Sequence, residues 1–182
     1  MTRGSFVAVV GPSGAGKDTL IREAIAGRAD MILARRVITR PPAPDSEDFE
    51  SVNTAEFTRR REAGVFAMHW EAHGLSYGIP ITVDAQLATG FNVIANLSRK
   101  LIETGRQRFE SFRVIVVAAP VAVLAERLAQ RGRETAEDIA KRLKRAGFAP
   151  PVGDDVITVE NGGDLQTAVA AFRAALPQPA NG

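Results

Sequence analysis

Apolar and polar positions alternate in blocks along the chain. Short apolar runs bounded by turn residues are typical of buried strands, and longer stretches with apolar positions three or four apart are typical of helices. The expected strands are 5–10, 35–39, 65–70, 93–97, 113–120 and 156–159. The expected helices are 17–28, 54–64, 80–89, 99–109, 121–130, 136–146 and 165–176. This alternation predicts an α/β fold with a mostly parallel sheet and helices on both faces.

Two segments interrupt the alternation. Residues 39–50 are rich in proline and acidic residues, so we expect no regular element there, and residues 74–80 (GLSYGIP) are predicted to form a loop. We find no internal repeat and no linker, and a length of 182 residues fits a single domain. The last residues, from 177 to 182, are expected to form a frayed tail.

The composition narrows the classes of partner. A net charge of +2 does not argue for nucleic acid. The absence of cysteine excludes a disulfide framework and a thiolate metal site. The apolar runs are too short to cross a bilayer, and the N-terminus has no signal-peptide pattern. We therefore expect a cytoplasmic protein with small-molecule partners and neither a nucleic acid nor a membrane; the oligomeric state is not specified by the sequence.

The first expected strand runs into the sequence GPSGAGKDT. Its glycines and lysine fit the phosphate-binding pattern G-x-x-x-x-G-K, between a strand and a helix. Backbone N–H groups of such a loop surround a phosphate, the helix N-terminus adds its dipole, and Lys17 can reach the outer phosphates. The predicted ATP-binding residues of this loop are Gly11, Pro12, Ser13, Gly14, Ala15, Gly16, Lys17, Asp18 and Thr19.

Asp18 departs from the pattern, which usually has Ser or Thr after the lysine to hold magnesium. A carboxylate in the first helical turn suits the helix dipole, which gives it a structural alternative. Magnesium also accepts carboxylates directly or through water. Because the strands 93–97 and 113–120 end without an acidic residue, we predict that Asp18 serves Mg²⁺ through water. His69 and His73 lie on a strand and a loop without a third ligand, so we predict no metal site there.

The stretch RLAQRGRETAEDIAKRLKRA, residues 127–146, is rich in arginine. A kinase needs positive charge that closes over the transferring phosphoryl group. We predict that this stretch is a lid, with Arg131 and Arg133 binding ATP, and with Arg131 and Arg142 acting in catalysis together with Lys17. The alternative is a solvated, charged helical hairpin.

Several motifs occur in the order found in one superfamily. They are GPSGAGK, ITRPP at 38–42, HGLSYG at 73–78, QRGRE at 130–134 and NGGDL at 161–165. Over residues 6–176 the chain thereby resembles the guanylate kinase superfamily. The resemblance implies a three-layer α/β/α P-loop NTPase with a small acceptor-binding region (about 36–90) and a helical lid (about 127–146). It also implies that Asn161 lies at the edge of the adenine of ATP. The alternative is that Asn161 and Gly162 form a simple turn.

The acceptor region departs from the guanylate kinase pattern. Arg40 matches the first of two arginines that bind the acceptor phosphate, but residues 42–43 supply no second. Phe49 stands near an expected tyrosine, and positions 68–69 lack the acid that reads guanine. The strand that usually ends in D-x-D ends here in NLSR, residues 96–99. These changes favour an anion-binding pocket over a base-reading one.

The elements GKD, ITR, SED at 46–48, HWEAHGLSYG, N-x-SR and RGRE together resemble a subfamily, the ribose 1,5-bisphosphate phosphokinases of bacterial phosphonate breakdown. The resemblance implies that ATP phosphorylates ribose 1,5-bisphosphate, giving ADP and 5-phosphoribosyl 1-diphosphate (PRPP). An acceptor phosphate is already ionised, so positioning and charge neutralisation suffice for catalysis. The predicted acceptor-binding residues are Arg40, Tyr77, Asn96, Ser98 and Arg99, with Arg36 as a weaker further candidate.

Alternatives stay open for several of these residues and for the function. Tyr77 can simply pack, Asn96 and Ser98 can cap a strand end, and Glu47 and Asp48 are expected in a solvated acidic loop. A guanylate kinase or other small-molecule kinase is the first functional alternative. A catalytically inactive guanylate kinase-like binding module is the second, although its class typically loses the phosphate loop. A GTP switch lacks its N-K-x-D motif here.

Overall fold

The structure is a computed structural model that describes residues 3–42, 47–132 and 134–179. Arg133, one of the predicted ATP-binding residues, lies outside the described residues. The same holds for Ala43 and Ser46 of the predicted acceptor region and for the last three residues of the expected tail.

The chain divides into two compact units, which are described separately. The first unit comprises Met1–Ala8, Arg28–Phe112 and Pro177–Gly182, and the second comprises Val9–Gly27 and Arg113–Leu176. The predicted acceptor-binding region falls within the first unit. The phosphate loop and the predicted lid fall within the second.

The larger sheet has the strand order β2-β7-β1-β8-β9. Its strands are β1 (Phe6–Val10), β2 (Met31–Leu33), β7 (Asn92–Asn96), β8 (Phe112–Ala118) and β9 (Val156–Glu160). β2 pairs with β7 in parallel, and β8 pairs with β9 in parallel. The predicted parallel sheet is thereby confirmed. The three-residue strand β2 was missed, because its identity comes from pairing with β7 and too few residues carry a pattern.

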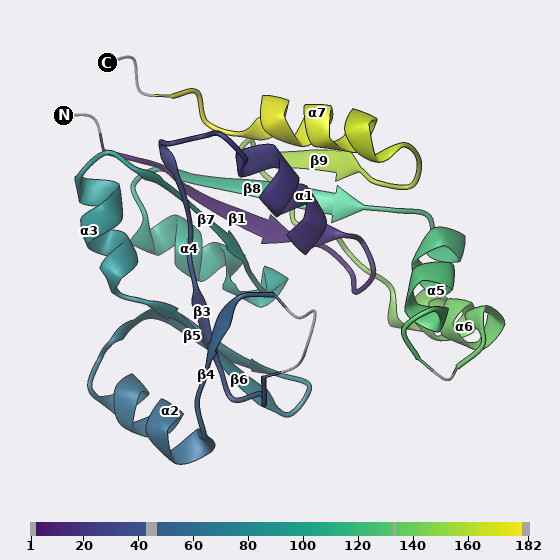
Figure 1. The fold of residues 1–182 in the computed structure, drawn as a ribbon, viewed down its shortest axis with the longest axis horizontal. Helices are drawn as coiled ribbons and strands as arrows, with labels where there is room; N and C mark the ends of the chain where they lie inside the picture. Colours follow the sequence, from purple (N-terminus) through teal and green to yellow (C-terminus); the bar gives the residue numbers. More distant parts are fainter. Residues whose placement is uncertain (1–2, 43–46, 133, 180–182) are drawn as a thin grey trace. The chain divides into compact units, whose positions relative to one another are not determined.

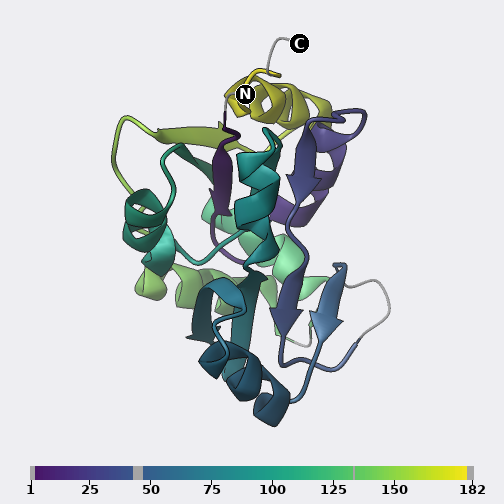
Figure 2. The ribbon, with the colours of Figure 1, turned by 90° about the vertical axis from the view of Figure 1, so that its left-hand side faces the viewer.

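The smaller sheet lies wholly in the first unit and has the order β4-β3-β6-β5. Its strands are β3 (Arg36–Ile38), β4 (Phe49–Ser51), β5 (Phe66–Ala72) and β6 (Leu75–Pro80). β3 and β4 run in parallel, as the two neighbouring arrows in Figure 2 show, and β6 pairs antiparallel with β3 and β5. Two predictions were therefore wrong: residues 75–80 of the expected loop form the strand β6, and the segment 39–50 ends within the strand β4.

The strand β6 was predicted to be a loop because its segment contains glycine and proline. The β5–β6 turn is His73–Gly74, with φ of 52° and 74°, and such positive values suit the twist of a two-residue hairpin. Gly78 is buried in the strand, where a Cβ atom would lie 2.6 Å from the Phe66 ring. Pro80 is the last residue of the strand. These residues mark a close approach and a strand end, which are both tolerated within a sheet.

The helices of the first unit are α2 (Thr54–Glu62), α3 (Thr82–Ala88), the 3₁₀ turn η1 (Arg99–Leu101) and α4 (Ile102–Arg108). α2 begins after Asn53, whose side chain accepts a hydrogen bond from the Glu56 backbone N–H at 2.8 Å, so the cap lies one residue before the predicted Thr54. On its buried side, Phe57 stacks on Phe66 with ring centres 4.7 Å apart.

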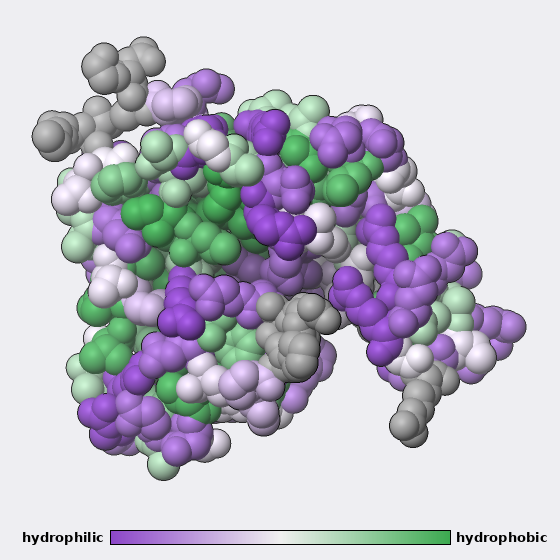
Figure 3. Space-filling view, viewed as in Figure 1, coloured by the Kyte–Doolittle hydropathy of each residue, from purple (hydrophilic) through white to green (hydrophobic). Residues whose placement is uncertain are grey.

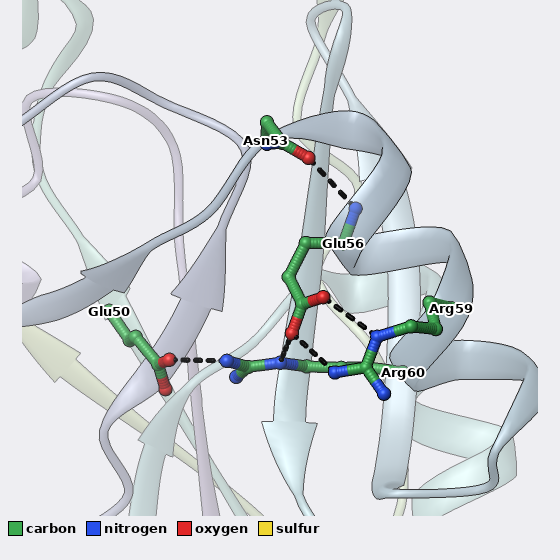
Figure 4. A network of polar contacts seen from close by, with 5 residues as sticks. All are labelled: Glu50, Asn53, Glu56, Arg59 and Arg60. Carbon is green, nitrogen blue, oxygen red and sulfur yellow. Dashed lines mark hydrogen bonds and ion pairs between the residues drawn. The ribbon is translucent and has the colours of Figure 1, made fainter.

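A polar network ties α2 to β4 (Figure 4). The Glu56 carboxylate accepts hydrogen bonds from Arg59 at 2.8 Å and Arg60 at 2.6 Å, and Arg60 also pairs with Glu50 at 2.8 Å. The hydrogen bonds from Arg59 and Arg60 lower the pKa of Glu56 to about 2, because they favour the ionised carboxylate.

A second polar contact holds the C-terminal part of the chain. Arg28 donates to the Asp30 carboxylate at 2.7 Å and to the carbonyl oxygen of Pro177 at 2.8 Å. The hydrogen bond from Arg28 lowers the pKa of Asp30, and Asn92 donates to the same carboxylate. Pro177 is buried, so the predicted frayed tail is wrong at its first residue.

The helices of the second unit are α1 (Lys17–Ile25), α5 (Val121–Ala129), α6 (Ala136–Ala146) and α7 (Leu165–Ala175). α1 and α7 pack side by side (Figure 1). Arg173 of α7 donates to the carbonyl oxygen of Glu23 at 2.7 Å, which satisfies a free carbonyl of the last turn of α1. Within the described residues, no helix has the length and apolar character needed to cross a membrane.

Candidate active site

The phosphate loop follows β1, whose five residues are all buried, and leads directly into α1. The loop is closed by a hydrogen bond from the Ala15 backbone N–H to the carbonyl oxygen of Pro12 at 3.2 Å. Gly16 stands at the N-cap position of α1 with a φ of 88°, a left-handed conformation that favours glycine. The strand–loop–helix arrangement that the sequence predicted is therefore present.

The side chain of Lys17 folds over this loop. Its ammonium donates to the carbonyl oxygens of Gly11 at 2.9 Å and Pro12 at 3.1 Å. The charge is therefore held at the mouth of the phosphate loop, where the sequence predicted contact with outer phosphates. Asp18 is exposed in the first turn of α1, and Ser13 is exposed in the loop.

Two residues outside the loop hold it in shape. Arg127 of α5 donates from Nη1 to the carbonyl oxygens of Gly14 at 3.3 Å and Ala15 at 3.4 Å, and from Nη2 to that of Asn161 at 2.8 Å. The Asn161 side chain donates to the carbonyl oxygen of Ala15 at 2.7 Å. We call Arg127 and Asn161 the loop clamp.

The loop clamp explains both the burial of Asn161, which is 4% exposed, and the need for glycine at position 16. A Cβ atom on Gly16 would lie 2.5 Å from the Asn161 amide nitrogen. The sequence predicted that Asn161 edges the adenine, whereas in the structure its side chain supports the phosphate loop. Later in the same NGGDL motif, Asp164 caps α7 by accepting from the Thr167 backbone N–H, which lowers the pKa of Asp164.

Arg127 was not singled out by the sequence analysis. It opens the arginine-rich run and precedes Arg131 by four residues, one helical turn. That spacing was the available signal, but it could not show that the two side chains have different surroundings. Arg127 is half-buried against the loop, whereas Arg131 is exposed after the end of α5.

The predicted lid forms two helices that pack together, α5 and α6. Ile139 of α6 is 2% exposed, so one side of the hairpin packs. The other side is charged, and Figure 3 shows hydrophilic residues gathered over these helices at the right of the view. Arg142 is exposed there and pairs with Glu134 at 2.9 Å, a contact between side chains that are both more than half exposed.

An apolar pocket of about 460 Å³ lies beside the phosphate loop within the second unit. Pro12 of the loop lines it together with Leu124 of α5, Leu143 of α6 and Phe148. The same pocket is therefore lined by the phosphate loop and both helices of the predicted lid.

In the first unit, three charged side chains of the predicted acceptor region meet. Arg36 on β3 is 9% exposed, and its Nη2 donates to Glu47 Oε2 in a short hydrogen bond. Arg40 donates from Nη2 to Glu47 Oε1 at 3.4 Å. Glu47 thus bridges two guanidinium groups. Its side chain is 18% exposed, so the expectation of a solvated acidic residue was wrong for Glu47.

Asp48 behaves as expected, with a side chain that is 76% exposed and pairs with the exposed Arg35 at 2.9 Å. The difference between these neighbouring carboxylates follows from their positions just before β4. The parallel register of Arg36 opposite Phe49 brings Glu47 near the buried guanidinium.

The guanidinium groups of both arginines lie over aromatic rings. The Arg40 guanidinium lies 4.4 Å from the centre of the Phe49 ring, and that of Arg36 lies 5.6 Å from the Tyr77 ring. Tyr77 stacks on Trp70 with ring centres 5.1 Å apart. The Tyr77 ring therefore packs, as the alternative had it, and binding of a phosphate by its hydroxyl stays a prediction.

The remaining predicted acceptor residues follow β7. Asn96 ends the strand, and its carbonyl oxygen accepts a hydrogen bond from Arg36 Nη1 at 3.3 Å. Ser98 precedes η1, whose N-terminus has no capping hydrogen bond from its side chain. Arg99 is exposed in the first position of η1. Asn96 is thereby placed beside the cluster of Arg36, Arg40 and Glu47, whereas the roles of Ser98 and Arg99 stay predictions.

The chain is similar over most of its length to ribose 1,5-bisphosphate phosphokinases. The chain is 51% identical over 172 residues to the ribose 1,5-bisphosphate phosphokinase PhnN of Acidiphilium cryptum (strain JF-5), covering 93% of this chain and 90% of that protein. It is 48% identical over 174 residues to the enzyme of the same name from Brucella melitensis biotype 2, again covering 93% and 90%. The chain belongs to the ribose 1,5-bisphosphate phosphokinase family. No family model matches the chain.

Among solved structures, the guanylate kinase of Anaplasma phagocytophilum matches with a TM-score of 0.64 and 18% identity, covering 96% of this chain and 84% of that one. This likeness confirms the predicted guanylate kinase-like α/β fold. The family assignment agrees with the resemblance that the GKD element suggested, and the role of Asp18 in that element stays a prediction.

Proposed function

We infer that the chain is an ATP-dependent phosphotransferase that converts ribose 1,5-bisphosphate to 5-phospho-α-D-ribose 1-diphosphate, with ADP as the second product, in phosphonate catabolism. The observation that carries this function is the identity of 44–51% to ribose 1,5-bisphosphate phosphokinases over most of the chain. The meeting of Arg36 and Arg40 at Glu47 in the predicted acceptor region supports a phosphorylated acceptor.

On the donor side, the phosphate loop binds ATP. Backbone N–H groups of residues 11–17 surround the phosphates, and the N-terminus of α1 adds its partial positive charge. Lys17 leaves the carbonyl oxygens of Gly11 and Pro12, which hold its ammonium at 2.9 and 3.1 Å, and neutralises the outer phosphates. Arg131 and Arg142 add positive charge from the lid, and Arg142 exchanges its exposed contact with Glu134 for a phosphate oxygen.

On the acceptor side, Arg40 and Arg36 bind a phosphate of the sugar. Arginine presents two parallel N–H groups that match the oxygens of a phosphate. Asn96 at the end of β7, with Ser98 and Arg99 directly after that strand, completes the acceptor set. The site needs no carboxylate that recognises a nucleobase, because the proposed acceptor contains no nucleobase.

The reaction needs no strong general base. An oxygen of the 1-phosphate attacks the terminal phosphorus of ATP, the bond from that phosphorus to the bridging oxygen breaks, and ADP leaves with the electron pair. The attacking oxygen is already ionised at neutral pH. Positioning and neutralisation of charge therefore supply the rate enhancement, as is general in phosphoryl transfer.

We further propose that Mg²⁺ binds with ATP beside Asp18. Among the described residues, no group of three or more His, Asp and Glu side chains can hold a metal. Magnesium is typically bound by one or two carboxylates together with substrate phosphates and water, and the exposed Asp18 beside Lys17 fits this requirement. When bound, the ion neutralises phosphate charge. The predicted cytoplasmic location, where ATP is available, belongs to the same proposal.

The test is a coupled assay of ADP release with three acceptors in parallel: ribose 1,5-bisphosphate, ribose 5-phosphate and GMP. We expect ADP release above background with ribose 1,5-bisphosphate and a much lower rate with the other two. Ribose 5-phosphate is the matched control because it lacks the 1-phosphate that accepts the phosphoryl group. A higher rate with GMP would overturn the proposed acceptor.

A further inference from the structure

The carboxylate of Glu47 lies between the guanidinium groups of Arg36 and Arg40. Its two oxygens accept hydrogen bonds from different guanidinium groups, Oε2 from Arg36 and Oε1 from Arg40. The Arg36 side chain is 10% exposed and that of Glu47 is 18% exposed. An unpaired buried charge is costly, so Glu47 acts as the counter-ion of both arginines.

The two guanidinium groups offer more hydrogen bonds than Glu47 uses. Arg40 Nε is buried and, within the part of the chain that the structure describes, has no hydrogen-bond partner. A buried donor without a partner costs free energy, and a carboxylate has two oxygens with which to satisfy it. A phosphate group has three terminal oxygens and a larger charge. The chemistry of the site thus suits a phosphate monoester better than the carboxylate that is present.

The arginines are also held by contacts that do not involve Glu47. Asn96 accepts from Arg36 Nη1 at 3.3 Å, and the ring of Phe49 lies 4.4 Å from the Arg40 guanidinium. The two guanidinium groups can therefore keep their places when Glu47 leaves them. An anion-binding pair that is prearranged in this way favours exchange of one anion for another.

We propose that Glu47 is an internal competitor for the acceptor, whose carboxylate is displaced when a phosphate of the sugar binds Arg36 and Arg40. This inference rests on the proposed function, because it deepens the acceptor specificity of the same site. Only an anion that binds both arginines can displace the carboxylate of Glu47. Glu47 therefore selects doubly charged phosphate groups and weakens the binding of single-charge anions.

The test is Glu47→Gln, with Asp48→Asn as the matched control. Both variants remove one negative charge from neighbouring positions, but Asp48 pairs with the exposed Arg35 and touches neither guanidinium of the cluster. Calorimetry without nucleotide measures the dissociation constants of ribose 1,5-bisphosphate and of inorganic phosphate. We expect both ligands to bind about ten-fold more tightly to Glu47→Gln, the scale of one charge-assisted hydrogen bond, and with unchanged affinity to Asp48→Asn.

Glu47→Ala is measured in parallel and is expected to show the same gain, with melting temperature confirming that each variant folds. Equal or weaker binding by the Glu47 variants would show that Glu47 orients the arginines, and an equal gain in Asp48→Asn would show a general charge effect. Either result overturns the proposal, as does a lack of binding to every variant. Turnover is scored separately: failure of the wild-type chain to phosphorylate bound ribose 1,5-bisphosphate counts against the proposed function alone.

Discussion

Lys17 and Asp18 are neighbours at the start of α1, but Lys17 is half-buried against the phosphate loop and Asp18 is exposed. We therefore expect different roles for the two side chains. The Lys17 ammonium already lies on the loop carbonyls of Gly11 and Pro12. Replacement by alanine is expected to lower kcat by about a hundred- to a thousand-fold, on the scale of a lost electrostatic contact to the transition state. Steady-state kinetics measure the loss. The melting temperature should change little, because Lys17 is half-buried and not part of the apolar core.

For Asp18, we expect the substitution Asp18→Asn to raise the magnesium concentration that gives half-maximal turnover, since a neutral amide is a poorer ligand for a hard cation. A magnesium titration of the initial rate measures it. Glu23→Gln is the matched control, because it removes a carboxylate from the same helix at a more distant position. An unchanged magnesium requirement in Asp18→Asn, or an equal shift in both variants, would assign Asp18 to the helix dipole alone.

The acceptor cluster shows why some site residues escape prediction from sequence. Glu47 and Asp48 are adjacent acidic residues in one proline-rich segment, and their composition is that of a solvated loop. The parallel pairing of β3 with β4 separates them, since it places one carboxylate by Arg36 and leaves the other in solvent. Three-residue strands carry too little periodicity to reveal such a register. The phosphate loop was predictable because all its chemistry lies within one continuous stretch.

At the scale of elements, the contact between α5 and the phosphate loop is the least expected feature of the donor side. Arg127 donates to three carbonyl oxygens, including that of Asn161. We expect Arg127→Ala to raise the KM for ATP about ten-fold, because the loop loses charge-assisted hydrogen bonds that fix its shape. Kinetics with varied ATP measure it. Lys141→Ala, on the exposed side of α6, is the control and should leave this KM unchanged.

If Arg127 instead bound substrate directly, Arg127→Lys would restore the charge and most of the activity. A positioning role predicts that lysine fails, since one ammonium cannot replace the two nitrogens that reach Gly14 and Asn161. Recovery of the wild-type KM in Arg127→Lys would therefore contradict the loop clamp.

The attachment of α2 to β4 makes stability depend on pH. Glu56 has a pKa of about 2 in the folded protein against an ordinary value of 4.5, so its ionised form is favoured by folding. This contribution is present above about pH 4.5 and is lost as the pH falls towards 2. We expect Glu56→Gln to melt at a lower temperature than the wild type at pH 7, by a small amount because the contacts are exposed.

The difference in melting temperature between Glu56→Gln and the wild type should shrink between pH 4.5 and pH 2. Glu62→Gln, at the exposed end of the same helix, controls for the loss of one negative charge. A difference that is constant over this range would show that Glu56 does not stabilise through its ionised form.

The order of elements was the most predictable part of the fold. β1, α1, β8, α5 and α7 carry long apolar runs or helical periodicity, and their bounds differ from the predicted ones by a few residues. β2, β4 and β6 were missed for physical reasons: two are three residues long, and β6 contains a glycine that the Phe66 ring requires and ends in proline. Pairing partners define such strands, and those lie elsewhere in the sequence.

At the scale of the whole molecule, a guanylate kinase-like fold is combined with an acceptor region that we propose binds anions. The fold alone permits several kinases, because sites can change while the architecture stays the same. The family assignment indicates a phosphorylated sugar without a base, and we propose that Arg36 and Arg40 bind one of its phosphates. The acceptor and the atom that is phosphorylated therefore define the function of this chain.

The most direct test is phosphorus NMR of the purified protein with ATP, magnesium and ribose 1,5-bisphosphate, beside a sample with GMP. We expect a new pair of coupled diphosphate signals from the sugar, growing as ADP appears, with the 5-phosphate signal retained. In the GMP sample we expect no GDP. Formation of GDP, or of ADP without a sugar diphosphate, would show that ribose 1,5-bisphosphate is not the acceptor.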